Sequence, residues 1–347
     1  MSIRVGLVGY GLAGSVFHAP LIESVEGLSL TAIVTSQTET VKQDYPQVEV
    51  VPTFERLLER DDIELVVVAA PNVTHHDFAR RALEAGRHVV VDKPFVIHAA
   101  ESDDLIDLAL RQHVVLSVFQ NRRWDNDFLT VRQLLEGYLL GEITTCEIHY
   151  DRFRPEVNSR WREQPLPGSG TLYDLGAHLI DQALFLFGTP QTVWADVGAQ
   201  RQGAQVDDYF HIVMGYGQRR VILHAGSLVR EEPPRFQLHG SKGSFLKYGL
   251  DPQEDQLKEG MRPGDPGWGQ DDPDMYGVVT IHAGGVEIKG TVTTLAGRYE
   301  AYYQGMVEAI AQGRPAPVAP EDARNTARVI DCALKSQQEQ RVITFAE

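Results

Sequence analysis

The chain has 347 residues, of which 43% are hydrophobic and 23% charged, a balance that is typical of a folded globular protein and excludes wholesale disorder. Its formal net charge of −16 argues against nonspecific binding to nucleic acid or to an anionic membrane, because both attract basic surfaces. The length predicts two domains rather than one.

Cysteine usage and the lengths of the apolar runs predict the compartment. Cys146 and Cys332 are the two cysteines, and they are far apart and outside any C-x-x-C spacing. We therefore expect neither a disulfide framework nor a thiolate zinc site, and a reducing compartment fits. An apolar strand begins at residue 3, which leaves no room for a signal peptide. No apolar run approaches the ~20 residues that cross a bilayer, so we expect a cytoplasmic protein without a membrane partner.

The first predicted element is a short apolar strand, residues 3–8, and the glycine-rich run Gly9-Tyr10-Gly11-Leu12-Ala13-Gly14 follows it at once. A strand that leads into G-x-G-x-x-G is the dinucleotide-binding fingerprint. Gly9 would make the tight turn, Gly11 would let the backbone approach a pyrophosphate, and Gly14 would let the next helix pack closely on its strand. An ordinary glycine-rich turn is the alternative, and the preceding strand argues against it.

A helix is predicted to run from about residue 13 to residue 26. Its first N–H groups and the positive end of its dipole would point at the phosphates of a bound dinucleotide. The coenzyme contacts expected from this loop are Gly9, Tyr10, Gly11, Leu12 and Ala13.

Residues 28–34 are predicted to form a second strand, and the residues at its carboxyl end indicate which coenzyme the protein prefers. In NAD-preferring proteins an acidic residue at this point accepts hydrogen bonds from the ribose 2′-hydroxyl. Here Thr35 and Ser36 stand at the strand end, and the first acid is Glu39. Hydroxyl groups donate hydrogen bonds to a 2′-phosphate, whereas a carboxylate repels it. We therefore expect NADP, with NAD as the alternative if the loop tolerates both nucleotides.

Strands and helices alternate from residue 3 to residue 121, as a doubly wound parallel sheet requires. The further strands are predicted at residues 63–70, 88–92 and 114–120, and a capping box at Thr74 is expected to open the helix that ends at Gly86. Ligands of such sheets lie at the carboxyl ends of the strands. The side chains expected there, in addition to Thr35 and Ser36, are Pro71, Asn72, His75, Lys93 and Asn121.

From residue 122 to residue 347 the pattern changes to a second, α+β domain. A helix is expected over residues 129–140, followed by strands near 143–153, 191–200, 208–216, 219–229, 235–240, 244–248, 277–282 and 286–294. Short turns between them predict a mostly antiparallel open sheet, covered on one face by helices and buried on the other in an oligomer. Residues 249–276 have no period and are predicted to be a long loop. Pro320 is expected to begin the last helix.

The most informative stretch of this second half is Gly168–Asp181, where a glycine segment leads into a helix that Gly188 stops. Asp174 and His178 are four residues apart and therefore share a helical face with Asp181. Three interpretations are open. His178 is a general base supported by an aspartate; the three side chains bind a divalent metal ion; or they form a satisfied polar network in the core.

Lys93 follows a buried strand of the first domain, at the edge where ligands bind. Near a bound nicotinamide its ammonium group would polarise a hydroxyl whose carbon gives up hydride, and burial would lower its pKa. A surface lysine at the end of a strand is the alternative.

Together these residues resemble the glucose–fructose oxidoreductase, inositol dehydrogenase and rhizopine-catabolism (Gfo/Idh/MocA) family. The matches are Val5–Gly11, the Asp92-Lys93-Pro94 form of the family's Glu-Lys-Pro signature, and Asp174–Asp181. The stretches at 119–125, 151–155, 161–163 and 239–244 are similar to the NADP-dependent scyllo-inositol dehydrogenases. The resemblance covers nearly the whole chain, although Asp92 departs from the usual glutamate by one methylene.

The resemblance implies a role for each matched residue. Lys93 and His178 would be catalytic, with His178 as the acid/base, and Asp174 would bind and position the substrate. Trp161 and Arg162 would lie near the nicotinamide. The implied substrate-binding set is Asn121, Arg123, Tyr173, Asp174 and His178, with no metal.

We therefore expect an NADP(H)-dependent oxidoreductase that acts on the CH–OH group of a cyclic polyol or sugar, as a homodimer or homotetramer. The alternative is a regulatory protein that binds NAD(P) without turnover.

Overall fold

The computed structural model describes residues 2–158 and 160–345, which fall into two compact units. The first comprises residues up to 124 together with 253–268 and 298–324, and the second comprises 125–252, 269–297 and the residues from 325 onwards. The sequence predicts one boundary between residues 121 and 122. The structure assigns two later segments to the first unit as well, because α8 (Gln253–Lys258) packs on the helix after the glycine loop and α9 (Glu300–Gln312) packs on α1 (Ala19–Ser24).

The first unit is built on a six-stranded parallel sheet in the order β3-β2-β1-β4-β5-β6. This is the strand order of the dinucleotide-binding fold, so the predicted doubly wound sheet is confirmed. β4 and the three valines of β5 are wholly buried valine-rich runs, as helices on both faces require. The strands are β1 (Ile3–Val8), β2 (Leu28–Val34), β3 (Glu49–Val51), β4 (Leu65–Val68), β5 (His88–Asp92) and β6 (Leu116–Phe119).

The helices of the first unit connect these strands. They are η1 (Ala13–His18), α1 (Ala19–Ser24), α2 (Thr38–Asp44), α3 (Phe54–Leu58), η2 (Asn72–Thr74), α4 (His75–Glu84), α5 (Ala99–Gln112) and η3 (Asn121–Trp124), with α8 (Gln253–Lys258) and α9 (Glu300–Gln312) from the later segments. The predicted capping box is wrong, because the Thr74 hydroxyl donates to the carbonyl oxygen of Pro71 instead of capping α4. Gly86 does follow the helix with a φ of +70°.

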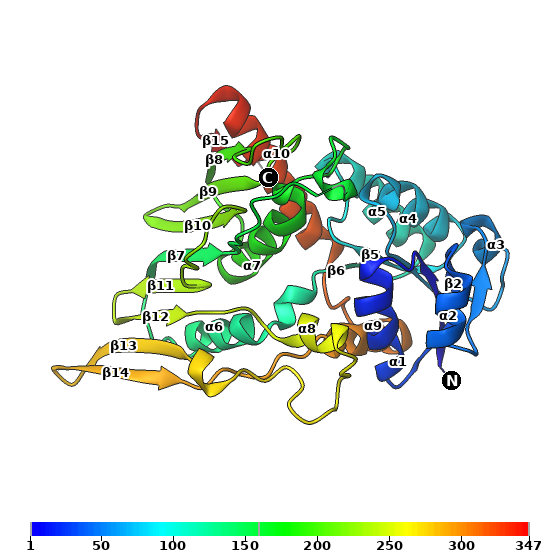
Figure 1. Ribbon diagram of the computed structural model, residues 1–347, viewed down its shortest axis with the longest axis horizontal. Coiled ribbons are helices and arrows are strands. Elements are labelled where there is room, and N and C mark those ends of the chain that lie inside the picture. The colour runs from blue at the N-terminus through cyan, green and yellow to red at the C-terminus, as the bar shows by residue number, and fades with distance from the viewer. Residues whose placement is uncertain (1, 159, 346–347) are drawn as a thin grey trace. The chain divides into compact units, whose positions relative to one another are not determined.

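The second unit is built on a nine-stranded sheet in the order β14-β13-β12-β11-β7-β10-β9-β8-β15. Its strand pairs are antiparallel except for β7 with β10, so the predicted open sheet is confirmed. Figure 1 shows β13 and β14 as a long hairpin at one side of this sheet. The strands are β7 (Ile143–His149), β8 (Thr192–Gly198), β9 (Tyr209–Tyr216), β10 (Arg219–Gly226), β11 (Phe236–Gly240), β12 (Gly243–Lys247), β13 (Gly277–Ala283), β14 (Val286–Val292) and β15 (Ile343–Thr344).

The helices after residue 124 differ in two places from the sequence prediction. α6 (Asn126–Glu136) begins three residues before the predicted helix, because the carboxylate of Asp251, 125 residues along the chain, accepts the N–H of Asn126 at 2.7 Å. The predicted loop at 249–276 contains α8 and the short η6 (Pro273–Met275). The others are η4 (Trp161–Glu163), η5 (Leu172–Gly176), α7 (Ala177–Phe187) and α10 (Pro320–Glu339), whose first residues belong to the first unit.

Strand alternation gives the second sheet two different faces. Residues such as Ile148, Phe210 and Leu223 are fully buried, and a Cβ built on Gly176 of η5 would meet the ring of Phe210 at 3.5 Å. The η5–α7 segment therefore covers this inner face. The alternate residues point to the outer face and are half-buried or exposed. Among the described residues, no helix is both long and apolar enough to cross a bilayer.

Candidate coenzyme and active site

The glycine loop after β1 uses its three glycines in three different ways. Gly9 has a φ of +100°, and a Cβ there would lie 2.4 Å from the carbonyl oxygen of Ala69. A Cβ on Gly14 would lie 2.1 Å from the carbonyl oxygen of Gly9, whereas a Cβ on Gly11 would meet no protein atom within 4 Å. Gly9 and Gly14 are therefore fixed by the fold itself. Gly11 leaves an open space in front of the loop.

The loop leads directly into η1, which starts with Leu12 in helical conformation and Ala13 as its first residue. Leu12 is 50% exposed, and Ser15 donates both its N–H and its hydroxyl to the carbonyl oxygen of Gly11. The first turns have π-helical spacing, a form that is often found at functional sites. The N-terminal end of this helix is thus exposed at Leu12.

The carboxyl end of β2 carries hydroxyl groups and no acid. The Thr35 hydroxyl oxygen accepts the N–H of Gln37 at 3.1 Å, which leaves its proton available to an acceptor, and Ser36 is exposed. The Gln37 side chain donates to the carbonyl oxygen of Tyr10 at 2.9 Å and so ties this loop to the glycine loop. The nearby carboxylate of Asp44 is occupied by the Tyr10 hydroxyl at 2.7 Å.

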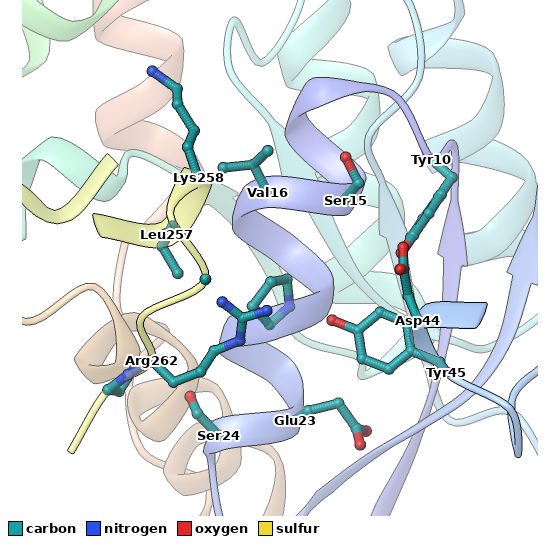
Figure 2. A pocket seen from close by; sticks show the side chains of 13 residues that line it. Tyr10, Ser15, Val16, Glu23, Ser24, Asp44, Tyr45, Leu257, Lys258 and Arg262 are labelled. Atoms are coloured by element: carbon teal, nitrogen blue, oxygen red, sulfur yellow. The ribbon is translucent and has the colours of Figure 1, made fainter. Parts of the chain in front are cut away.

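A cavity of about 650 Å³ lies beside the helix formed by η1 and α1 (Figure 2). It is lined by Tyr10, Ser15, Val16, Pro20, Glu23, Ser24, Asp44, Tyr45, Leu257, Lys258, Gly260, Arg262 and Pro263. In Figure 2 the guanidinium group of Arg262 faces the helix from the segment after α8. Of the predicted coenzyme residues Tyr10 alone lines this cavity, so the predicted coenzyme contacts and the cavity are different surfaces of the first unit.

Pro71, Asn72 and His75 follow β4 in the turn η2 and the first residue of α4. The two ring nitrogens of His75 lie 2.8 Å and 2.9 Å from the carbonyl oxygens of Pro94 and Ala70. Burial lowers the pKa of this imidazole, so the ring is neutral and donates to one of the two. His75 therefore connects the loops that follow β4 and β5, and its side chain is buried in the protein.

Lys93 directly follows β5, and its neighbours fix its backbone. Its N–H donates to the carboxylate of Asp92 at 2.8 Å. That carboxylate also lies 3.9 Å from Nε2 of the fully buried His18, whose Nδ1 is 2.6 Å from the Tyr303 hydroxyl. Burial acts to raise the pKa of Asp92, but hydrogen bonding and charge from His18 with the charge of Lys93 outweigh it and lower that pKa. The sequence analysis missed His18, which the glycine loop's own helix carries.

Asn121 and Arg123 lie in η3, just beyond the end of β6, and both are buried. The terminal nitrogens of Arg123 donate to one carboxylate oxygen of Asp322 at 3.1 Å. Arg123, which the sequence analysis placed at the substrate, therefore already pairs with a residue in the first turn of α10.

In the second unit, the predicted helix that ends before Gly188 is present, but its first part is the π-helical η5. Tyr173 is 8% exposed, His178 5% and Asp181 2%, whereas the Asp174 side chain is 23% exposed. Gly188 ends the helix with a φ of +74°. Asp174 lies in the π-helical segment and is the more accessible of the two acids, whereas Asp181 is buried.

Arg162 and Asp174 form the polar part of this site. The guanidinium group lies 3.5 Å from the Asp174 carboxylate and 5.3 Å from the centre of the Trp161 ring. Gly170 donates its N–H to the carbonyl oxygen of Arg162 at 3.0 Å, which links η4 to the glycine segment before η5. The structure thus brings together Trp161, Arg162 and Asp174, which the sequence analysis placed at the substrate and nicotinamide.

Asp207 is a residue of this site that the sequence analysis missed. Its carboxylate accepts the N–H of Leu172 at 2.7 Å, its backbone carbonyl accepts the N–H of Thr171 at 2.9 Å, and a Cβ on Gly170 would collide with it. Burial raises the pKa of Asp207 to about 6. Asp207 therefore holds the first turn of η5, and the acidic pair Asp207-Asp208 before β9 was the only signal in the sequence.

The metal interpretation of the helix gains no support from the geometry. Within the described ranges, the side chains whose possible ligand atoms lie within 4.8 Å of one another are His149, Asp151 and His224, on the sheet. That group includes neither Asp174 nor His178. The acid/base interpretation and the polar-network interpretation of the η5 and α7 residues both stay predictions.

Family comparisons cover both units. Residues 3–120 match the family model described as oxidoreductase family, NAD-binding Rossmann fold. Residues 132–345 match the model described as oxidoreductase family, C-terminal alpha/beta domain. Both models describe the Gfo/Idh/MocA oxidoreductase family, so the resemblance stated from the sequence is confirmed.

Individual proteins are similar over the full length. The chain is 44% identical to scyllo-inositol 2-dehydrogenase (NADP(+)) IolW of Bacillus subtilis, over 99% of this chain and 96% of that protein. It is 46% identical to the oxidoreductase YdgJ of Escherichia coli, over 99% of each. The solved structure of the Bacillus subtilis protein yvaA superposes with a TM-score of 0.97, at 44% identity and with 99% of each chain covered.

Proposed function

We propose, on the premise that the chain belongs to the Gfo/Idh/MocA oxidoreductase family, that it transfers hydride between NADP(H) and a secondary alcohol carbon of a cyclic polyol or sugar. The observation that carries this proposal is the 44% identity, over 99% of the chain, to a scyllo-inositol 2-dehydrogenase that uses NADP+. Oxidation of an inositol-like alcohol and reduction of the corresponding ketone are the two directions of one reaction.

The first unit fits a dinucleotide. The open space in front of Gly11 accommodates a pyrophosphate, and the exposed start of η1 offers N–H donors with the positive end of a helix. Bound there, the coenzyme would supply the hydride acceptor or donor. The proposed contacts are those predicted from the sequence, with Gly9, Gly11 and Leu12 at the phosphates and Pro71 and Asn72 beyond them.

The preference for NADP rests on the end of β2. The Thr35 hydroxyl keeps its proton after accepting from Gln37, and Ser36 is exposed, so both are able to donate to a 2′-phosphate. The carboxylate of Asp44, which lies near the glycine loop, is held by Tyr10. Thr35 and Ser36 are therefore the proposed determinants of the coenzyme.

His178 is the proposed acid/base. It is 5% exposed, on a helix whose partly exposed Asp174 is paired with Arg162 at 3.5 Å. In oxidation the imidazole takes the hydroxyl proton as the same carbon loses hydride, and in reduction it returns the proton to the carbonyl oxygen. Asp174 accepts hydrogen bonds from substrate hydroxyl groups, and Arg162 pairs with its carboxylate.

Lys93 is the proposed electrophilic partner. Asp92 fixes its backbone, so the ammonium group starts from a defined position at the carboxyl end of β5. A cation there polarises the substrate oxygen and stabilises negative charge that develops on it during hydride transfer.

The test is an absorbance assay of nicotinamide reduction with a panel of inositols and sugars, run with NADP+ and NAD+. We expect turnover of an inositol-type polyol with NADP+. His178→Asn should lower kcat by at least about 100-fold and leave NADPH binding unchanged, and Lys93→Met should also lose turnover. A His178→Asn variant with native turnover would remove His178 from the role. Tight NADPH binding without turnover of any polyol or sugar would instead point to a coenzyme-dependent regulator.

A further inference from the structure

The outer face of the second sheet carries a row of histidines that the proposed reaction does not use. His149 of β7 stands beside His224 of β10 in the parallel register, and His224 faces His211 of β9 in the antiparallel one. Their inner-face neighbours in the strands, among them Ile148 and Phe210, are fully buried. The row therefore lies on the face opposite to the one that η5 and α7 cover.

Asp151 joins two of these histidines. It follows β7 by two residues and so continues on the same face as His149. One of its carboxylate oxygens lies 3.0 Å from Nδ1 of His149, and the other lies 2.8 Å from Nδ1 of His224. The second oxygen also accepts the N–H of Gly226 at 2.8 Å. A buried carboxylate thus stands between two imidazoles that two neighbouring strands hold in register.

We propose that His149, Asp151 and His224 bind a divalent ion of the zinc type on the outer face of the sheet. The three side chains offer two imidazole nitrogens and one carboxylate oxygen, with ligand atoms within 4.8 Å of one another. Two nitrogens and one oxygen suit Zn²⁺ or Co²⁺, whereas Mg²⁺ and Ca²⁺ prefer oxygen ligands throughout.

The distances between the ligand atoms fit such an ion. With Zn–N and Zn–O bonds of about 2.0–2.1 Å, neighbouring ligands of a tetrahedral ion are about 3.3 Å apart. Each Nδ1 contacts a different oxygen of Asp151, at 3.0 Å and 2.8 Å, and the three ligand atoms lie within 4.8 Å of one another, so small side-chain rotations bring two nitrogens and one oxygen to this spacing. The ion then replaces the two Nδ1 protons that these contacts share.

A second carboxylate stands behind His149. Oε2 of Glu147 lies 3.5 Å from Nε2 of His149, the ring nitrogen that the ion does not use. A carboxylate that accepts from the far nitrogen of a metal-bound histidine orients the ring and raises its basicity. Glu147, His149 and the ion therefore form the carboxylate–histidine–metal arrangement.

The three side chains differ in how far they are exposed to solvent. Asp151 is 2% exposed in its side chain, whereas His149 is 16% and His224 18% exposed. Three protein ligands with an accessible side leave one position for water or for a further ligand. Because the site lies on the opposite face from His178, the ion ties β7 to β10 and takes no part in hydride transfer.

The test is metal binding by the full-length, tag-free protein after chelator treatment, measured by Zn²⁺ titration and by the visible absorption of bound Co²⁺. We expect one tight equivalent per chain and the absorption of a four-coordinate Co²⁺ complex with nitrogen and oxygen ligands. His149→Asn and His224→Asn should each weaken binding by at least about 100-fold, because a direct ligand is lost. Neither residue belongs to the proposed coenzyme or catalytic set, so turnover with NADP+ reports that the variants are folded.

His239→Gln is the matched control. His239 lies on β11 of the same sheet, with its Nδ1 2.7 Å from the Ser244 hydroxyl, outside the proposed ligand set. This variant should bind Zn²⁺ as the wild type does. The proposal is overturned if the stripped wild type takes up no stoichiometric metal. It is equally overturned if His149→Asn and His224→Asn retain wild-type affinity, or if His239→Gln loses as much affinity as they do.

Discussion

Substitution of two glycines in the same loop by alanine should separate folding from coenzyme binding. Gly11→Ala places a Cβ where no protein atom lies within 4 Å, and Gly11 has no positive φ. The folded protein therefore accommodates the methyl group without strain. Because the unfolded chain loses conformational freedom, we expect unchanged stability or a gain of about 0.4–1 kcal/mol.

The same methyl group occupies the space proposed for the pyrophosphate. A phosphate that is pushed off the loop loses at least one hydrogen bond from an N–H to a charged oxygen, worth about 1.5–3 kcal/mol. This loss corresponds to an affinity for NADPH that is about 10- to 100-fold weaker.

Gly9→Ala is the contrasting variant. Its φ of +100° is costly for an alanine, and the new Cβ would lie 2.4 Å from the backbone oxygen of Ala69, which has no freedom to move. We expect a loss of at least about 2 kcal/mol in stability. A Cβ on Gly11 meets no protein atom within 4 Å, so the two variants should differ in their effect on stability.

The assays are thermal unfolding of the coenzyme-free protein and fluorescence titration with NADPH. Gly11→Ala should unfold at the wild-type temperature or slightly above it and bind NADPH weakly, whereas Gly9→Ala should unfold at a clearly lower temperature. Wild-type NADPH affinity in Gly11→Ala would refute the proposed position of the pyrophosphate. Equal destabilisation by both variants would refute the structural distinction between the two glycines.

Three further substitutions test other parts of the structure. Ser36→Asp places a carboxylate where the 2′-phosphate is proposed and should shift the ratio of kcat/KM toward NAD+ by at least about 10-fold, with Ser36→Asn as the neutral control; an unchanged ratio would contradict the assignment. Asp207 has a folded pKa of about 6, above its ordinary 3.8, so the folded state holds its proton more tightly and stability falls as the pH rises through this range. The fall should be about 1 kcal/mol between pH 5 and pH 8 in urea unfolding and should be absent in Asp207→Asn, which keeps an acceptor for Leu172; the same slope in both proteins would exclude Asp207 as its source. Lys247 is fully buried with its Nζ 3.0 Å from Asp271, so Lys247→Met should cost about 3–5 kcal/mol, and the double variant with Asp271→Asn should recover part of this loss; no recovery would mean that the ion pair is not the cause.

The sequence by itself determined the parts of the fold that depend on local pattern. The bounds of β2, the end of α7 at Gly188 and the start of α10 at Pro320 agree with prediction. Each depends on neighbouring residues alone, namely a short and mostly apolar run, a glycine with positive φ, and a proline that needs no N–H partner. The predicted coenzyme loop is local in the same sense, because its glycines are adjacent in the chain.

Tertiary contacts decided the rest. α6 begins at Asn126 because Asp251 caps it, and α8 forms inside the predicted loop where Glu254 pairs with Arg122 at 2.8 Å. Asp207 holds η5 across 35 residues, and His224 joins Asp151 across 73 residues. No local pattern marks such partners, because a hydrogen bond or an ion pair depends on distance in space and not on spacing in the chain. The residues that we propose to carry the chemistry were therefore readable from the sequence, whereas the groups that hold them in place became visible only once the chain was folded.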